Sequence, residues 1–380
     1  MKAAKEILPQ ESHDSGGWLD ADPSVPFDGP ATVSPWTRRA AANCYFHSGA
    51  PRLLRRFRER YELSFSDRRK ARLRRRKHCT ARILYYHRVN DENDPFFGAL
   101  PTAVFEQQMR YLAGHYRVVS IRDLVSHLED DTSPEMLVGI TFDDGYADNY
   151  HNALPILRRY NLPATIFLTT GSIDSGEPLW FEALAEAVKK TPHEFIDIEF
   201  DVAQRLWLRT QSERLQANGK IFAELRKLND GERNRRLAEL LRRLGLAGKS
   251  SRRHKMLTWE QVRLMRKQAI TFGGHTVTHP FLSRLTDSQL AWEVSECKRR
   301  IEDELQEAVS YFAYPNGREC DFHRPAKDAL DAAGYQAAMT TIWGMNVPLT
   351  DRMELRRGGP WETNPALFAC KFDWYQLANA

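Results

Sequence analysis

Residues 136–150, MLVGITFDDGYADNY, join a continuous uncharged run to two adjacent aspartates and a glycine. The run is apolar and rich in β-branched residues, which predicts a strand buried on both faces, as in a parallel sheet. Asp143 and Asp144 follow it directly, although their charges repel each other. Gly145 frees the backbone at the strand end, so both carboxylates can turn toward one side. The stretch therefore predicts a polar site at the carboxyl end of a parallel strand.

Further strand patterns lie on both sides of this stretch, and helical patterns separate several of them. The expected strands are ARILYYH (81–87), ATIFLTT (164–170), AITFGGH (269–275), VSYFAYP (309–315) and YQAAMTT (335–341). The expected helices cover residues 102–115, 147–160, 286–305 and 324–334. Strands that alternate with helices predict an α/β fold whose parallel sheet is open or closed into a barrel. Residues from about 180 to 254 are charged and mostly helical in composition. We expect them to form a helical insertion that walls or covers the site.

Length and cysteine usage restrict the class of protein. The chain has 380 residues, of which 42% are hydrophobic, enough for one large core or two ordinary ones. Its five cysteines include no CxxC pair, which disfavours a disulfide framework and a thiolate zinc site and favours a reducing compartment. No run of apolar residues is long enough to span a bilayer, and the start lacks the apolar core of a secretory signal. The sequence thus predicts a cytoplasmic protein.

Positive charge is concentrated ahead of the first expected strand. Residues 51–82 carry 14 Lys and Arg against 3 Asp and Glu, whereas residues 1–50 carry 4 against 6. We expect residues 1–50 to be a disordered extension and residues 51–80 to be a basic, helical segment. The basic segment is either a solvated linker or an attachment to an anionic membrane surface at the inner membrane face. Nucleic-acid binding by a chain with a vestigial barrel is a third alternative, which the lack of a recognised nucleic-acid motif disfavours.

A histidine pair supplies further candidate ligands. In HTVTHP (275–280), His275 and His279 are four residues apart, so both imidazoles can reach one point. Two neutral imidazoles and one aspartate make the three-ligand set of a catalytic zinc site or a similar divalent site. A cation there would also offset the repulsion between Asp143 and Asp144.

Simpler interpretations exist for each of these residues. A histidine pair on a turn can be structural, and Asp-Asp-Gly is a common turn sequence. We expect Asp148 or Asn149 to cap the following helix, without a part in the chemistry. The histidines at 115, 127 and 151 lie within helical patterns and are expected to be packed or solvated.

Three motifs taken together resemble a known family. TFDDG (141–145), HTVTHP (275–280) and FAYPNG (312–317), in this order on alternating strands, are similar to the motifs of the polysaccharide deacetylase family, also called the NodB-homology or carbohydrate esterase family four domain. ILYYHRV (83–89) and FEQQMRYL (105–112) are similar to members found with exopolysaccharide biosynthesis. The resemblance implies a distorted (β/α) barrel, a divalent metal, usually zinc, and hydrolysis of the acetamide of N-acetylated sugars. It places a catalytic domain at residues 81–360 and leaves residues 361–380 as a tail.

The resemblance also implies roles for individual residues. Its metal ligands fall on Asp144, His275 and His279, its catalytic base falls on Asp143, and the backbone N–H of Tyr314 is placed near the oxyanion.

One position departs from the family pattern. Many members carry a Leu-x-His near the end of the domain, whose histidine is the general acid, but MELRRGG (353–359) holds no histidine here. We expect His87, at the end of the first strand, to act in its place because it should lie on the same rim. The alternative for His87 is a hydrogen-bonded structural histidine.

The substrate remains open between two classes. An esterase, or a hydrolase of C–N bonds in a small amide or ureide, would need the same metal and base. Only the substrate would separate such an enzyme from a polysaccharide deacetylase.

Overall fold

The computed structural model describes residues 79–131, 136–200, 202–245, 256–359 and 362–378. The predictions of a disordered extension at 1–50 and of a basic helical segment up to residue 78 lie outside these residues. Within the described ranges, no helix is both long enough and apolar enough to cross a bilayer.

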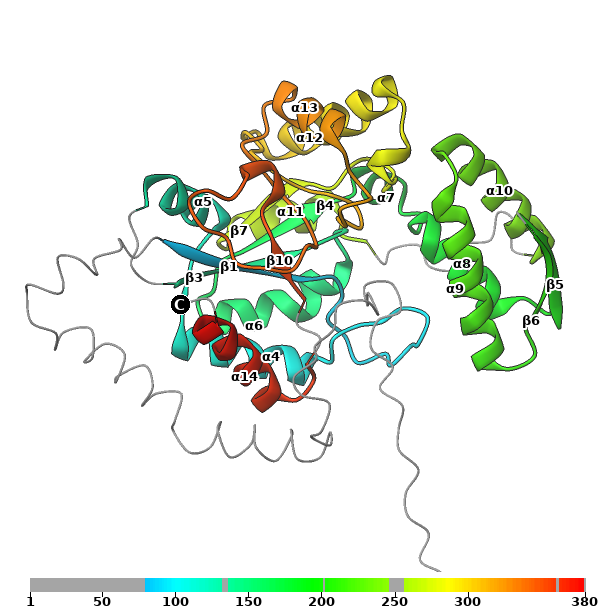
Figure 1. Ribbon diagram of the computed structural model, residues 1–380. Helices are drawn as coiled ribbons and strands as arrows, with labels where there is room; N and C mark the ends of the chain where they lie inside the picture. Colours follow the sequence, from blue (N-terminus) through cyan, green and yellow to red (C-terminus); the bar gives the residue numbers. More distant parts are fainter. Residues whose placement is uncertain (1–78, 132–135, 201, 246–255, 360–361, 379–380) are drawn as a thin grey trace, which may run out of the picture.

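Parallel strands form a nearly closed barrel at the centre of the molecule (Figure 1). The strands are β1 (Thr80–Tyr86), β3 (Met136–Phe142), β4 (Ala164–Leu168), β7 (Ile270–Gly274), β8 (Tyr311–Ala313), β9 (Ala337–Met339) and β10 (Arg357–Gly358). Their order is β10-β1-β3-β4-β7-β8-β9, and the short β2 (Arg117–Val118) pairs with β3. Two hydrogen bonds connect the segments next to the edge strands β9 and β10: Leu355 N–H donates to the Ala338 carbonyl, and Arg357 N–H donates to the Ile342 carbonyl. The predicted (β/α) barrel is confirmed.

Helices surround the barrel. They are α4 (Thr102–His115), α5 (Ile121–Asp130), α6 (Leu154–Arg159), α7 (Thr170–Ser175), α11 (Trp259–Arg266), α12 (Asp287–Leu305), α13 (Arg324–Ala332) and α14 (Pro365–Ala378). The helix expected over 147–160 forms as a π-helical turn, Asn149–Ala153, followed by α6. α12 begins where its sequence indicates, because Thr286 and Gln289 form a capping box at its start.

The central strand β3 explains why this sequence makes a barrel with helices outside it. Every residue from Leu137 to Phe142 is buried, as a parallel strand covered on both faces requires. Gly139 lets α5 approach closely, because an added Cβ would lie 2.8 Å from Ile121 Cδ1. The strand is therefore uncharged and buried on both faces until it ends, and charged residues follow only at the rim.

The C-terminal segment belongs to the core. Residues 361–380 were expected as a tail, yet they contain α14, which packs against α4. Phe368 and Phe372 are buried in the main hydrophobic cluster. Arg82 Nη1 also donates to the Phe372 carbonyl at 2.8 Å. Residues up to Phe372 therefore extend the packed domain beyond residue 360.

The predicted insertion lies between β4 and β7 and forms a unit beside the barrel, drawn in green in Figure 1. It comprises α8 (Trp180–Lys190), β5 (Phe195–Glu199), β6 (Ala203–Trp207), α9 (Gln211–Lys227) and α10 (Asp230–Arg243). The antiparallel β5–β6 hairpin was not anticipated from the mostly helical composition. The insertion has its own hydrophobic cluster, which also takes in Phe96, Phe97 and Phe281 from the barrel side.

Candidate metal centre and catalytic site

Asp144, His275 and His279 converge at the carboxyl ends of β3 and β7. One potential ligand atom from each lies within 4.8 Å of the others, and all three residues are buried. Asp144 Oδ1 is 3.4 Å from His275 Nε2 and 3.2 Å from His279 Nε2. The structure thus brings together the three residues that the sequence proposed as metal ligands.

The protonation pattern of these residues fits a cation. His275 Nδ1 lies 2.7 Å from the Ala313 carbonyl, so Nδ1–H donates to that oxygen and Nε2 is the ring nitrogen that faces Asp144. Burial lowers the pKa of His279, which favours its neutral form. Burial alone would raise the pKa of Asp144, but the two imidazoles outweigh it and hold that pKa well below its usual range. Asp144 Oδ1 is buried without a hydrogen bond from any described residue. The chemistry of this donor set therefore fits a divalent metal.

The loops that carry these ligands adopt uncommon backbone conformations. Asp144 has a φ of 72°, Thr276 of 67° and His279 of 57°, all in the left-handed region that L-residues seldom occupy. The loop that carries the two histidines is stabilised by an internal hydrogen bond, in which Thr276 Oγ1 accepts from His279 N–H at 3.0 Å. Such conformations cost about 1–3 kcal/mol each and persist only where surrounding contacts enforce them.

Asp143 has a different partner. Its carboxylate accepts two hydrogen bonds from Arg357, at 2.8 Å from Nη1 and 2.7 Å from Nη2, in a bidentate pair. Arg357 is fully buried and also donates from Nε to the Thr340 carbonyl. Burial alone would raise the pKa of Asp143, but Arg357 and His275 outweigh it, so the pKa lies below its usual value. Asp143 is therefore a carboxylate at neutral pH.

Arg357 was missed in the sequence. It lies in the MELRRGG stretch, where the family pattern would place a histidine. The only available signal was a charged residue in a short segment beside two glycines, which is too weak to indicate a buried ion pair.

His87 lies at the same rim. It lines the cavity that also contains Asp144 and His279, and it is close enough to lower the pKa of both aspartates. Its carbonyl accepts from Asn149 Nδ2 at 2.8 Å.

Asp148 makes no helix-cap hydrogen bond and instead accepts from Asn90 Nδ2 at 2.7 Å. The predicted capping by Asp148 or Asn149 is therefore wrong, because both side chains bond to the segment that begins with His87.

Tyr314 requires a correction. Its N–H donates to the Met339 carbonyl at 3.0 Å, and its buried phenol donates to the Met353 carbonyl at 2.9 Å. The predicted oxyanion contact is not available to this N–H, because Tyr314 still belongs to the β8–β9 ladder. The chain leaves the sheet only afterwards. Asn316, with a φ of 61°, lines the cavity, and its buried Nδ2 has no hydrogen-bond partner among the described residues.

The site opens into a cavity of about 190 Å³. Asp144 and His279 of the barrel line it together with residues of α8 and α9. The insertion therefore walls the site, as its position in the sequence predicted.

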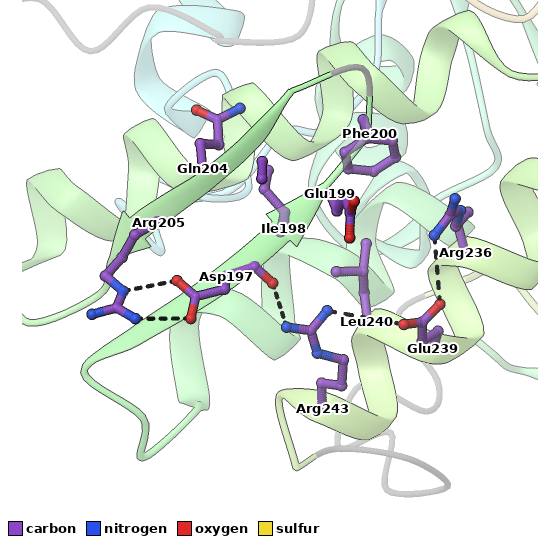
Figure 2. A pocket seen from close by; sticks show the side chains of 11 residues that line it. Asp197, Ile198, Glu199, Phe200, Gln204, Arg205, Arg236, Glu239, Leu240 and Arg243 are labelled. Carbon is purple, nitrogen blue, oxygen red and sulfur yellow. Dashed lines mark hydrogen bonds and ion pairs between the residues drawn. The ribbon is translucent and has the colours of Figure 1, made fainter.

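A second cavity, of about 670 Å³, lies within the insertion between the β5–β6 hairpin and α10 (Figure 2). Its charged side chains interact with one another: Asp197 accepts two hydrogen bonds from Arg205, and Glu239 lies 3.9 Å from Arg236 and from Arg243. Since most of its charged side chains are paired with one another and it lies apart from Asp144, His275 and His279, it is not a second candidate for the chemistry.

Comparison with known sequences supports the resemblance. Residues 130–197 and 245–338 match the sequence model of the family described as polysaccharide deacetylase. YxkH of Bacillus subtilis (strain 168) is 24% identical over 261 residues, which cover 68% of this chain and 63% of that protein. Poly-beta-1,6-N-acetyl-D-glucosamine N-deacetylase of Staphylococcus aureus (strain MSSA476) is 31% identical over 111 residues, 26% of this chain and 38% of that protein. The chain thus spans less than two-thirds of the length of these curated relatives.

Solved structures support the fold. The deacetylase PplD of Streptococcus pyogenes, in complex with acetate, matches with a TM-score of 0.50 and 19% identity over 74% of this chain and 92% of that one. IcaB from Ammonifex degensii matches with a TM-score of 0.51 and 19% identity over 77% of this chain and 98% of that one. At this level of identity, both comparisons concern the fold alone.

Proposed function

We propose that this chain, which belongs to the polysaccharide deacetylase family, removes the acetyl group from an N-acetylated sugar of the exopolysaccharide type. One observation supports this reaction above the others: three buried metal-type ligands lie directly beside a carboxylate that an arginine keeps ionised. Amide hydrolysis needs an activated carbonyl and a base for water, and this pairing can supply both.

Asp144, His275 and His279 would hold a divalent cation, Zn²⁺ in our proposal. When bound, such an ion supplies a Lewis acid for the acetyl carbonyl and lowers the pKa of a nearby water. The remaining steps belong to the side chains of this protein.

Asp143 is the base in this mechanism. It accepts a proton from the water whose oxygen forms a bond to the acetyl carbon, and Arg357 fixes the orientation of its carboxylate. Asn316 Nδ2, which has no other partner in the described part of the chain, donates to the oxygen on which negative charge develops. The C–N bond then breaks as His87 donates a proton to the leaving amine, so that acetate and a free amino sugar are released.

Acetate release tests the proposal directly. The purified chain is depleted of metal with a chelator, divided, and assayed on N-acetylated oligosaccharides with and without added Zn²⁺. We expect acetate only after metal is restored. Cleavage of a simple ester or a ureide, with no acetate from any N-acetylated sugar, would assign the site to the other substrate class.

A separate proposal concerns residues 51–80, whose excess of Lys and Arg is typical of attachment to anionic lipid. We infer that this segment holds the protein at the cytoplasmic face of the inner membrane. Sedimentation with anionic and with neutral liposomes compares the full chain with one that begins at residue 80. Equal binding by the two chains would exclude this role.

A further inference from the structure

The insertion determines the shape of the cavity above the metal ligands. α8 contributes Phe181, Glu182 and Ala185 to the lining, and α9 contributes Leu215, Asn218, Gly219 and Phe222. The match to the family stops at residue 197 and resumes at residue 245, so all of α9 lies outside it. The α9 part of this wall is therefore an addition to the matched family pattern, whereas α8 lies within the matched residues.

Besides Asp144, His279 and Asn316, two residues of the cavity lining have a buried polar atom without a partner among the described residues: Arg88, at Nη1, and Asn218, at Oδ1. The Arg88 side chain is only 5% exposed, and its charge is balanced by Asp148 at 3.4 Å and Glu92 at 3.9 Å. Nη1 therefore offers a hydrogen-bond donor to an uncharged group, and Asn218 Oδ1 offers an acceptor. Buried polar atoms without partners are rare because they are costly, so a ligand that pairs with both is expected here.

Aromatic side chains form part of the remaining lining, and the space is small. Phe181 contacts the His279 ring with centroids 5.2 Å apart, and Phe222 stacks on Trp180. Phe96 and Phe97 complete this apolar surface. The volume of about 190 Å³ is below the roughly 300–1,000 Å³ of pockets for drug-sized ligands. One sugar ring with its acetamido group suits such a space better than an extended chain.

We propose that the insertion restricts this enzyme to a single terminal residue of an uncharged N-acetylated sugar chain. Arg88 Nη1 donates to one hydroxyl of that residue, Asn218 Oδ1 accepts from another, and the aromatic side chains contact the faces of the ring. The inference rests on the proposed deacetylase function and adds the substrate class: the end of a chain and not its interior.

Product analysis on N-acetylated oligosaccharides of increasing length tests this inference. We expect one acetate per chain whatever the length, with the free amine located at a terminal residue by tandem mass spectrometry. Free amines at internal positions, in numbers that grow with length, would overturn the inference and leave the deacetylase function intact. If oligosaccharides of every length released no acetate while an ester was cleaved, both the inference and the proposed deacetylase function would be overturned.

A steric variant tests the wall itself. Gly219 lines the cavity, and a Cβ added to it would meet no atom within 4 Å. Gly219→Leu should therefore fold and fill part of the cavity, with a loss of kcat/KM on the sugar of about 10–200-fold, as for other small changes of pocket volume. The matched control is Gly114→Leu, also helical and also in open space, which should leave kcat/KM unchanged.

Two readouts separate a blocked cavity from a damaged metal site. Gly219→Leu should retain its bound metal, and it should lose much less activity on a small aryl acetate than on the sugar. Asn218→Ala should raise KM for the sugar more than it lowers kcat. Equal losses on both substrates, or no loss on the sugar, would show that α9 does not recognise the substrate.

Discussion

Asp143 and Asp144 are neighbours in the chain, yet their side chains meet opposite surroundings. Asp143 forms a bidentate pair with Arg357, while Asp144 faces the two imidazoles. The repulsion between them is therefore offset twice, by a guanidinium on one side and by the proposed cation on the other. In the proposed mechanism, this asymmetry gives two residues of one type different duties: Asp144 as a ligand and Asp143 as a base.

Substitution of each aspartate by asparagine should separate these duties. Asp144→Asn removes a charged ligand, so metal content and activity should fall together. Asp143→Asn should keep its metal and lose about 10²–10⁴-fold in turnover, the usual contribution of general base catalysis. Metal analysis after dialysis, beside single-turnover kinetics, makes the comparison. Equal metal loss by the two variants would contradict the division.

The role of His87 can be tested by changing the leaving group of the substrate. If it protonates the departing amine, His87→Ala should lower turnover of the amide far more than turnover of an activated ester, whose leaving group needs no proton. Both rates are measured on one metal-loaded preparation. Losses of the same size on both substrates would make His87 a structural residue.

The sequence predicted the positions of the candidate ligands better than the residues that support them. Asp144, His275 and His279 follow strand patterns that are visible locally, and the parallel fold brings strand ends together. Arg357 reaches Asp143 across 214 residues, a pairing that no local pattern reveals. The resemblance to the family placed the Tyr314 N–H near the oxyanion, whereas in the structure this N–H donates to the Met339 carbonyl.

At the scale of elements, α12 holds the loop that carries both histidines. Glu293 on α12 is buried, and its Oε2 accepts from Val277 N–H at 2.7 Å and from Thr278 N–H at 3.0 Å. The carboxylate thus accepts hydrogen bonds from two backbone N–H groups of this loop and stabilises the left-handed conformations of its residues. The strands around it were predictable because they are buried throughout. The β5–β6 hairpin was missed, although exposed and buried residues alternate along β5 as in a half-buried strand, because the charged, helical composition around this five-residue segment outweighs the alternation.

Glu293 should therefore influence metal affinity without touching the metal. Glu293→Ala should weaken affinity by about 10–100-fold, as removal of other supports of metal ligands does. Glu293→Gln keeps a carbonyl oxygen for the two N–H groups and should restore most of the affinity. Competition with a chromophoric chelator measures both variants. An alanine variant with wild-type affinity would show that the loop holds its shape alone.

At the scale of the whole molecule, the C-terminal helix completes the core that the barrel begins. Phe368 is 4% exposed, and its ring lies against Tyr111 with centroids 6.1 Å apart. Arg82, from the first strand, bonds to the same helix at Phe372. Both ends of the described chain are therefore joined in one packed unit.

Truncation of one side chain should measure this contribution. Phe368→Ala should lower the free energy of unfolding by about 3–5 kcal/mol, as expected for a large buried aromatic residue. The matched control is Phe195→Ala on the insertion, where the ring is 39% exposed and the change should stay within about 1 kcal/mol. Urea denaturation followed by circular dichroism compares the two. Equal, small effects would mean that α14 is only loosely attached.

The position of the insertion has a consequence for synthesis on the ribosome. β3 and its two aspartates are made first, the insertion follows, and Arg357 emerges 214 residues after Asp143. At roughly 5–20 residues per second, this delay is about 10–40 s. During that time the Asp143 carboxylate has no guanidinium, so water must remain around the end of β3. The insertion has its own hydrophobic cluster and can fold during this time. Once it is folded, the connection between the paired strands β4 and β7 behaves like a short loop, so that less entropy is lost when they pair. The barrel can therefore close, and water can leave the site, only after the last strand has been synthesised.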